Sequence, residues 1–410
     1  MNALISRRTL LAAGLGGCLA ALVPGDPVLA QRAKLSFEKW VEQFRARAKA
    51  RGVSDATYNS VMKGIKPDTS VYAQDRAQPE FREKAWQYLN RRVSDWRIAT
   101  GKDRAREHAA LLTRIEKEYG VDRHIMLGLW GMESAFGDVV DNPKHMKPVF
   151  PSLVALAWGE PRRRGYWEQE LLNALVIVQR GWGRPAEMIG SWAGAMGHTQ
   201  WMPEVWLNMG VDFDRDGRIS PFKPADALAG TARYLVQRGN YRRGEHWGYE
   251  VKLPARMSAR TQGLRTVAAW AKAGVQRANG KEFPQAKEKA RLWQPALQGP
   301  VFLITQNFQA VKSYNPSGLY ALAIVHLGDR IAGAGPISRP FPGGERPMTL
   351  AELQEVQKRL TAAGFDTGGT DGRIGQQTMR AVRDFQLKAG IKPADGYAGL
   401  KVLAKLRQAG

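Results

Sequence analysis

At 410 residues, the chain is long enough for two or three domains with a substantial core. A hydrophobic content of 44% excludes an intrinsically disordered chain, and a net charge of +23 indicates a polyanionic partner: nucleic acid, anionic lipid or an acidic cell-wall polymer. The basic residues are spread along the whole chain, which favours a general attraction over a groove-reading motif.

Residues 1–30 have the pattern of a signal peptide. Arg7-Arg8 precedes an apolar run from Leu10 to Val23, and Val28-Leu29-Ala30 supplies small residues for cleavage after Ala30. The apolar run is too short for a stable membrane span, and Ser6–Leu11 resembles a twin-arginine signal. We therefore expect an exported protein, which makes a nucleic-acid partner the least suitable of the three.

Cys18 follows Leu15-Gly16-Gly17, a sequence that resembles a lipobox. Plain cleavage after Ala30 is the favoured prediction, and a lipid on Cys18 that anchors the protein to a membrane is the alternative. Cys18 is the only cysteine, so the mature chain has no disulfide, no cysteine metal site and no thiol nucleophile.

Helical patterns fill residues 34–120, and the next helix carries a lone carboxylate, Glu133. Ile125, Leu129 and Met132 give this helix an apolar face, and Phe136-Gly137 breaks the pattern, so Glu133 falls in the last turn. Apolar neighbours and the negative end of the helix dipole both disfavour the charged carboxylate. We expect a raised pKa, which suits a general acid; a surface glutamate at a helix end is the alternative.

Residues 191–203 combine small and aromatic residues, with two glycines and two alanines between Trp192 and His198. Small residues let backbones approach closely, as on the floor of a cleft, or as in tight helix packing. Gln200 and Trp201 offer an amide and an aromatic face in the same stretch.

Asp212, Asp214 and Asp216, followed by Gly217-Arg218, form the first half of a calcium-binding loop. Lys223 occupies the position of the usual bidentate glutamate, and Asp226 lies three positions further along. A calcium site closed by Asp226 and a plain Asp/Gly-rich turn, with Asp226 as a helix N-cap, both remain open.

The C-terminal part of the chain changes character twice. Short strands are predicted at 250–254 and 301–305, and a helix at 319–330. Residues 336–348 are rich in Pro and Gly, which predicts a linker. Thr349–Glu352 is a capping box that opens a separate domain, residues 349–410.

Four motifs occur in order: Gly131–Gly137, Gly190–Pro203, Pro224–Ala227 and Tyr314–Tyr320. Together they resemble the B-type membrane-bound lytic murein transglycosylases over residues 34–332. Residues 349–406 are similar to a three-helix peptidoglycan-binding domain. The resemblance implies a mainly α fold with a lysozyme-like catalytic core, residues 31–335, and a strand-containing insertion at roughly 249–311.

The resemblance implies that Glu133 is a single acid/base, which cleaves the bond between N-acetylmuramic acid and N-acetylglucosamine and leaves a 1,6-anhydro ring. It implies substrate-binding roles for a set of residues: Ser191, Gln200, a stacking Trp201, Arg163 and Arg164 toward the stem peptide, and Tyr314, Asn315 and Tyr320 on the distal wall. The chemistry needs no cofactor; a structural calcium would be held by Asp212, Asp214, Asp216, Arg218 and Asp226.

The expected protein is thus a monomer that binds peptidoglycan glycan strands in the periplasm of a Gram-negative bacterium, or on its outer membrane as a lipoprotein. The positive charge then attracts the stem-peptide carboxylates. The alternatives are a lysozyme-type hydrolase with a second carboxylate, and a non-catalytic wall-binding protein. The absence of a well-placed second carboxylate opposes the first, and Glu133, Ser191 and Gln200 together oppose the second.

Overall fold

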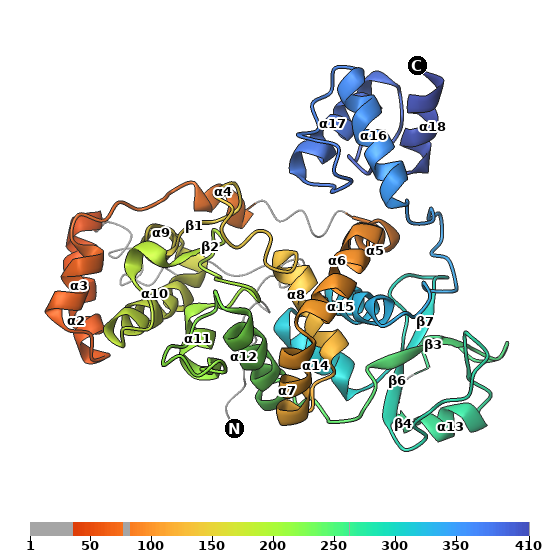
Figure 1. Ribbon diagram of the computed structural model, residues 1–410, viewed down its shortest axis with the longest axis horizontal. Coiled ribbons are helices and arrows are strands. Elements are labelled where there is room, and N and C mark those ends of the chain that lie inside the picture. The colour runs from red at the N-terminus through yellow and green to blue at the C-terminus, as the bar shows by residue number, and fades with distance from the viewer. Residues whose placement is uncertain (1–35, 77–82, 262, 410) are drawn as a thin grey trace, which may run out of the picture. The chain divides into compact units, whose positions relative to one another are not determined.

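The computed structural model describes residues 36–76, 83–261 and 263–409 (Figure 1). The predicted signal peptide and Cys18 lie outside them. The chain divides into two compact units, Met1–Phe81 with Glu133–Tyr234, and Arg82–Met132 with Leu235–Gly410. Among the described residues, no helix combines the length and apolarity needed to cross a membrane.

The first unit is built on a pair of apolar helices, α9 (Val149–Gly159) and α10 (Arg164–Gln179). Leu153, Leu156, Leu171 and Leu175 have no exposed surface. The unit also contains α2 (Phe37–Ala50), α3 (Asp55–Met62), α4 (Val71–Arg76), β1 (Lys147–Pro148), the 3-10 turns η3 (Pro161–Arg163) and η4 (Pro185–Glu187), β2 (Ile189–Gly190), α11 (Pro203–Met209) and α12 (Pro224–Gln237). Of these, α2, α3 and α11 pack against α10, and α4 and β1 pack against α9.

In the second unit, α15 (Gly318–Ile331) is buried and packs against α5 (Ala85–Arg92), α6 (Asp95–Glu107) and α14 (Gln306–Tyr314). α7 (Ala109–Tyr119) packs against α6, and α8 (Arg123–Ser134) leads from this unit into the first. Gly128 on α8 lies so close to α15 that an added Cβ would overlap the carbonyl oxygen of Ile324. This small residue lets the helix that leads to Glu133 pack tightly on α15.

The same unit contains an antiparallel sheet of order β4-β6-β7-β3-β5. Its strands are β3 (Gly248–Lys252), β4 (Arg265–Thr266), β5 (Gln276–Arg277), β6 (Lys289–Trp293) and β7 (Val301–Ile304), and α13 (Val267–Lys272) packs against it through Trp270. The predicted strands at 250–254 and 301–305 correspond to β3 and β7.

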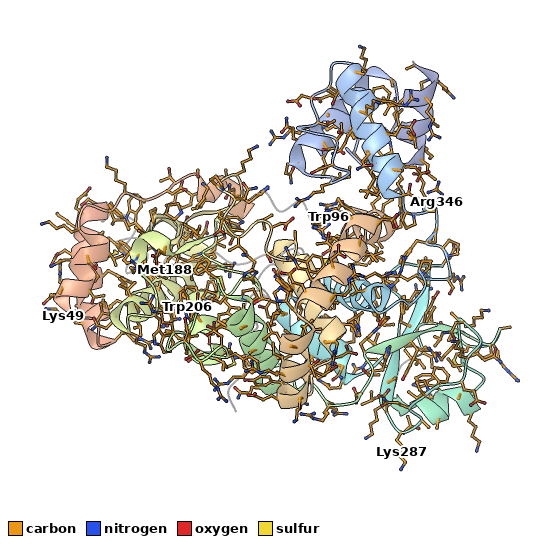
Figure 2. All side chains as sticks on the ribbon, viewed as in Figure 1. Lys49, Trp96, Met188, Trp206, Lys287 and Arg346 are labelled. Atoms are coloured by element: carbon orange, nitrogen blue, oxygen red, sulfur yellow. The ribbon has the colours of Figure 1, made fainter. Side chains whose placement is uncertain are left out.

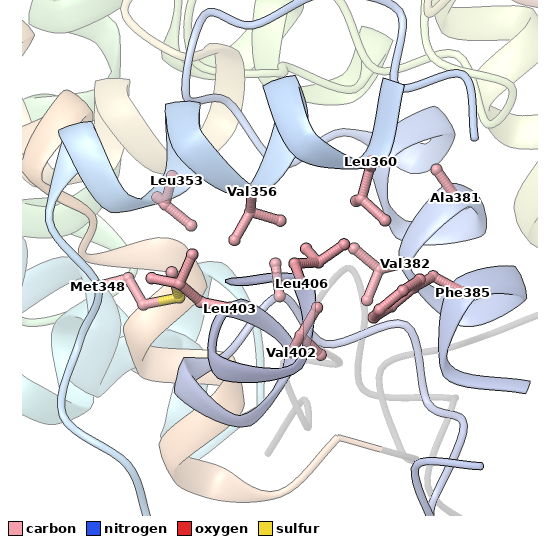
Figure 3. Close-up of a cluster of buried hydrophobic side chains, with 11 residues drawn as sticks. Met348, Leu353, Val356, Leu360, Ala381, Val382, Phe385, Val402, Leu403 and Leu406 are labelled. Atoms are coloured by element: carbon pink, nitrogen blue, oxygen red, sulfur yellow. The ribbon is translucent and has the colours of Figure 1, made fainter. Parts of the chain in front are cut away.

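The C-terminal domain consists of α16 (Leu350–Ala362), α17 (Gln376–Lys388) and α18 (Leu400–Gln408). Its predicted capping box is present, because Thr349 Oγ1 accepts from Glu352 N at 3.2 Å and Glu352 Oε2 accepts from Thr349 N at 2.8 Å. The helices close around one apolar cluster, which includes Leu353, Val356 and Leu360 from α16 (Figure 3). The mainly helical fold with a small sheet agrees with the prediction.

Candidate active site

Glu133 lies in the last turn of α8, as predicted, and is half-buried. The helix ends at Ser134 because Ala135, Phe136 and Gly137 have φ values of 52°, 60° and 96°. For a non-glycine residue this conformation costs about 1–2 kcal/mol, and such strain gathers at functional sites. The backbone after Glu133 is therefore held in a conformation that the surrounding structure must enforce.

Ser134 forms two hydrogen bonds that help to hold this backbone conformation. Its Oγ donates to the carbonyl oxygen of His198 at 2.6 Å and accepts from Gly137 N at 3.0 Å. The residue next to Glu133 is thus tied to the segment that carries Ser191 and Gln200.

Arg97 on α6 supports the same helix end, and no sequence pattern predicted it. Its Nε donates to the carbonyl oxygen of Gly131 at 3.3 Å, and its Nη1 donates to that of Arg91, also at 3.3 Å. Burial, and then the neighbouring arginines, lower the pKa of Arg97 to about 9, so the guanidinium stays protonated at neutral pH. The only signal in the sequence is an arginine in an otherwise ordinary helix.

Residues 190–203 form two tight turns in succession. In the first, Ser191 N donates to Ala195 O at 2.8 Å; in the second, Met196 and Trp201 exchange backbone hydrogen bonds of 2.8 Å each. Gly197 has a φ of 71° and Gln200 a φ of 54°. A Cβ at Gly197 would overlap the carbonyl oxygen of Pro221, so the close approach predicted from the small residues is present.

Ser191 and Gln200 both keep hydrogen-bonding capacity for a ligand. Ser191 Oγ accepts from Ala195 N at 3.2 Å, which leaves its O–H free to donate. Gln200 Nε2 donates to Gly197 O at 3.0 Å, which leaves its carbonyl oxygen to accept. An acetamido group offers the matching acceptor and donor.

The structure corrects the stacking role predicted for Trp201. Its indole has 0% exposed surface, and its Nε1 donates to Thr231 Oγ1 of α12 at 3.0 Å. Trp201 therefore supports the turn from beneath and presents no free ring face to a sugar.

Arg163 and Arg164 lie where η3 passes into α10. The Arg163 guanidinium lies 4.6 Å from the ring centre of Tyr166 and 4.7 Å from that of Trp167. Arg164 Nη2 donates to Trp158 O at 3.1 Å. Within the described residues no carboxylate pairs with either arginine, and both side chains are partly exposed, so their terminal N–H groups retain donors for an anion.

Trp192, for which the motifs implied no role, follows Ser191 directly and is half-buried. Its ring centre lies 6.4 Å from that of Trp167, so it continues the aromatic cluster beside Arg163. Its position within the small-residue segment was the signal that could have identified it as a sugar-stacking candidate.

Asp212, Asp214 and Asp216 each offer a carboxylate oxygen within 4.8 Å of the others, which is the donor set that a calcium ion prefers. Lys223 Nζ pairs with Asp214 at 3.0 Å and also with Asp216. Its ammonium group therefore competes with a cation for two of the three carboxylates. The backbone N–H of Arg218 donates to Asp216 Oδ1 at 3.0 Å and so helps to shape the loop.

Asp226 has a different position from the one predicted. It is fully buried, and its two oxygens accept from Phe213 N at 2.8 Å and from Ser220 N at 2.9 Å, outside the three-carboxylate cluster. Asp226 thus braces the loop from inside. Trp206, which is labelled in Figure 2, donates from Nε1 to Ile219 O at 2.8 Å and also holds the loop.

The loop in turn supports the active-site turns. His198 N donates to Pro221 O at 2.9 Å, and His198 Nε2 lies 3.1 Å from Phe222 O. A chain of hydrogen bonds therefore runs from the acidic loop, residues 212–226, through His198 to Ser134, the neighbour of Glu133.

Tyr314, Asn315 and Tyr320 lie in the second unit, at the junction of α14 and α15, and are buried. Asn315 Oδ1 accepts from Ser317 N at 3.1 Å, which shapes the turn before α15. Their role as the distal wall of the site stays a prediction.

Comparisons with known proteins match both parts of the chain. The family described as Transglycosylase SLT domain matches residues 36–329, and Putative peptidoglycan binding domain matches residues 349–406. Membrane-bound lytic murein transglycosylase B of Escherichia coli K12 is 28% identical over 272 residues, which are 65% of this chain and 71% of the relative.

Among solved structures, SltB3 from Pseudomonas aeruginosa in complex with NAG-anhNAM-pentapeptide is 39% identical, with a TM-score of 0.70 over 91% of this chain and 99% of that one. The Escherichia coli lytic transglycosylase Slt35 in complex with calcium is 24% identical, with a TM-score of 0.59 over 71% of this chain and 92% of that one, and it shares the fold.

Proposed function

The chain belongs to the transglycosylase SLT family, and we propose that Glu133 alone supplies both the acid and the base of its reaction. The enzyme is a peptidoglycan lytic transglycosylase, as the sequence motifs predicted, and this chemistry needs no cofactor. The observation that carries the proposal is the strained backbone at the end of α8. There Ser134, the residue after Glu133, donates a hydrogen bond to the carbonyl oxygen of His198.

The proposed reaction has two proton transfers through one carboxyl group. Glu133 donates its proton to the glycosidic oxygen between N-acetylmuramic acid and N-acetylglucosamine as the bond from that oxygen to C1 breaks. The muramoyl acetamido oxygen stabilises the positive charge that develops at C1. The Glu133 carboxylate then removes the proton of the C6 hydroxyl, whose oxygen attacks C1 and closes a 1,6-anhydro ring.

Because the nucleophile is an oxygen of the substrate, no second carboxylate is needed, in contrast to most glycosidases. Ser191 O–H and the carbonyl oxygen of Gln200 bind the substrate's acetamido group and keep its oxygen near C1. Support for these roles comes from the free donor and acceptor that each side chain retains.

Arg163 and Arg164 bind the carboxylates of the stem peptide. Both guanidinium groups are partly exposed and have no carboxylate partner within the described residues, so their terminal N–H groups can form charge-assisted hydrogen bonds to a carboxylate. SltB3, the relative with 39% identity, is described in complex with a muropeptide that carries a pentapeptide. Tyr314, Asn315 and Tyr320 keep, in this proposal, the substrate-binding role that the resemblance implies for them.

The acidic loop binds calcium through Asp212, Asp214 and Asp216, with Arg218 contributing through its backbone and Asp226 bracing the loop. Calcium would displace Lys223 and stiffen the loop that supports His198. The C-terminal domain, residues 349–410, holds the enzyme on the wall, and residues 1–30 direct export to the periplasm, with lipidation of Cys18 as the membrane-bound alternative.

A pair of isosteric variants tests the role of Glu133. Glu133→Gln removes only the exchangeable proton and charge, so we expect release of soluble fragments from purified peptidoglycan to fall by about a thousandfold or more. Asp138→Asn makes the same chemical change at an exposed carboxylate five residues further along, and we expect near-normal turnover. Substantial turnover by folded Glu133→Gln, or a large loss in Asp138→Asn, would contradict the proposal.

A further inference from the structure

The second unit contains a pocket of about 280 Å³ that the proposed reaction does not use. Three parts of the chain line it: Trp86, Leu89, Asn90 and Val93 of α5; His326 and Arg330 of α15; and residues 336–341 and 344–347 of the segment that leads to the C-terminal domain. The volume is near the lower end of those found in small-molecule sites.

On its polar side the pocket has an arginine, Arg330, whose charge no carboxylate neutralises within the described residues. His326 and Arg330 are one turn apart on α15. The Nε of Arg330 is buried and has no hydrogen-bond partner, and no carboxylate pairs with its guanidinium in the described parts of the chain. Burial, and then the charge of Arg330, lower the pKa of His326 to about 3, so this histidine is neutral at physiological pH and leaves the charge of the site to arginine.

Of the other charged side chains on the lining, Glu345 and Arg346 form hydrogen bonds within the protein, whereas Arg339 forms none among the residues that the structure describes. Glu345 Oε2 accepts from Leu400 N at 2.6 Å, and Arg346 (labelled in Figure 2) forms hydrogen bonds of 2.8 and 2.6 Å with Glu352. The exposed side chain of Arg339 has no partner within the described residues. The partly buried Arg330 and the exposed Arg339 therefore give the pocket a net positive character.

The pocket is preformed, because the linker that closes it is held at both ends. Ser338 N and Arg339 N each donate to the carboxylate of Glu250 on β3, at 2.8 Å. Asn90 Nδ2 donates to Glu345 O at 3.0 Å and to the Tyr397 hydroxyl at 3.1 Å. A ligand would thus meet an ordered site and would not have to order the linker itself.

The remaining lining is apolar and includes Trp86, Leu89, Val93, Pro340 and Phe341. A bare phosphate would gain little from these surfaces and would leave them exposed to water. A small organic anion with a compact apolar body matches both the arginine and the hydrophobic walls.

We propose that this pocket is a second binding site, which takes the free C-terminal carboxylate of a short peptide with small apolar side chains. The identification of that peptide with a peptidoglycan stem peptide rests on the proposed function. The carboxylate pairs with Arg330, and the terminal side chain packs between Trp86 and Phe341. The pocket then binds the peptide part of the wall at a place separate from Arg163 and Arg164.

A pair of probes that differ in one group tests the carboxylate requirement: N-acetyl-D-alanyl-D-alanine and its C-terminal amide. In calorimetric titrations of the full mature chain, we expect the acid to bind at least about tenfold more tightly than the amide. No binding of the acid at its highest soluble concentration, or equal binding of acid and amide, would overturn the proposal. Competition by inorganic phosphate as strong as by the acid would overturn the choice of an apolar carboxylate.

Substitutions then locate the site. We expect Arg330→Gln to weaken binding of the acid by at least about tenfold, and Arg339→Gln, whose side chain is exposed and leaves the fold intact, to weaken it by a smaller factor. Arg256→Gln changes the charge equally at an exposed arginine outside the pocket lining, and it should leave the affinity unchanged. Arg163→Gln reports whether the acid instead occupies the other candidate peptide site. Loss of binding in Arg163→Gln alone, with both pocket variants unaffected, would overturn the assignment.

The two proposals fail separately. Acid-specific binding that depends on Arg330, in a protein that releases no 1,6-anhydro product, would reject the proposed reaction and leave the carboxylate site standing. Normal product release without acid-specific binding would reject the site alone.

Discussion

The active-site turns and the C-terminal domain use their backbones in opposite ways. Ala135, Phe136 and Gln200, at the end of α8 and in residues 190–203, have positive φ values although none is a glycine. In residues 349–409 every positive φ belongs to a glycine. The first region keeps strained residues in place through hydrogen bonds such as Ser134 Oγ to His198 O, and the second relies on capped helices around one apolar cluster.

This difference separates two tasks. A site that does chemistry must hold a few groups in one geometry, and local conformational preference is sacrificed there. A domain that only has to fold and bind follows local preference throughout. Substitutions should therefore affect stability most in the C-terminal core and affect turnover most in the strained turns.

The largest expected effect is on folding of the C-terminal domain. Leu360→Ala removes a side chain with 0% exposed surface from the cluster (Figure 3), which should cost about 2–5 kcal/mol. Native-state hydrogen exchange of α16 should report the loss, and co-sedimentation with insoluble peptidoglycan should fall with it.

The matched control is Leu387→Ala on α17, where the side chain is 64% exposed. We expect little change in either measurement. Equal losses in the two variants would mean that the apolar cluster does not hold this domain together.

The next effect should be on turnover. Gly197→Ala forces a Cβ against the carbonyl oxygen of Pro221, which also accepts from His198 N at 2.9 Å, so the turn must shift. A displacement of about 1 Å near the chemistry can reduce the rate by about a hundredfold. Rates of fragment release, compared at equal amounts of folded protein, measure it.

Gly364→Ala gives the comparison in the C-terminal domain. Gly364 has a similar φ of 87°, but an added Cβ meets nothing within 4 Å. We expect a cost of about 1–2 kcal/mol in that domain and unchanged turnover of soluble glycan. If Gly197→Ala were as active as Gly364→Ala, the geometry of the turn would not matter for catalysis.

Calcium should stabilise only the region of the active-site turns and leave the C-terminal domain unchanged. Calcium at a hundredfold excess over Kd should stabilise the folded protein by about 2.7 kcal/mol and so raise the melting temperature. Asp214→Ala should abolish this increase. Lys223→Gln should strengthen calcium binding, because the competing ammonium is gone.

Asp384→Ala, which removes an exposed carboxylate of α17, should keep the full calcium response. A melting temperature that is insensitive to calcium in both the wild type and Lys223→Gln would leave residues 212–226 as a plain turn.

The smallest effect concerns an ion pair at the start of α16. Arg346, and then the backbone N–H of Thr349, lower the pKa of Glu352 to about 2. Since the folded-state pKa lies below the unfolded one, this stabilisation is present above about pH 4.5 and is lost as the pH falls through about 2.

Glu352→Gln keeps the capping box but removes the charge. Hydrogen exchange of α16 should therefore be slightly faster than in the wild type at pH 7, and the difference should vanish near pH 2. A difference that stayed constant with pH would assign the effect to the cap and not to the charge.

Sequence patterns predicted the helices of the C-terminal domain well, because a helix that packs on a core repeats its apolar residues at a fixed spacing. Leu353, Val356 and Leu360 follow the capping box at helical spacing, and all three are buried in one cluster. Glu133 was placed in the last helical turn because Phe136-Gly137 interrupts the apolar period, and the structure agrees.

Contacts between distant segments were not predictable in the same way. Trp201 is buried because Thr231, thirty residues later, accepts its N–H, and Arg97 reaches Gly131 from another helix. Neither contact leaves a periodic signal. Asp226 fitted a metal ligand by spacing, but both of its oxygens are hydrogen-bonded to backbone N–H groups of the loop.

The central claim, that the substrate supplies its own nucleophile to a site with a single acid/base, is tested most directly by digesting purified peptidoglycan in water enriched in oxygen-18. Mass spectrometry should find product ends that are one water lighter than reducing ends and contain no oxygen-18. Reducing ends with one oxygen-18 for each bond cleaved would show that water attacks C1 and would contradict the account.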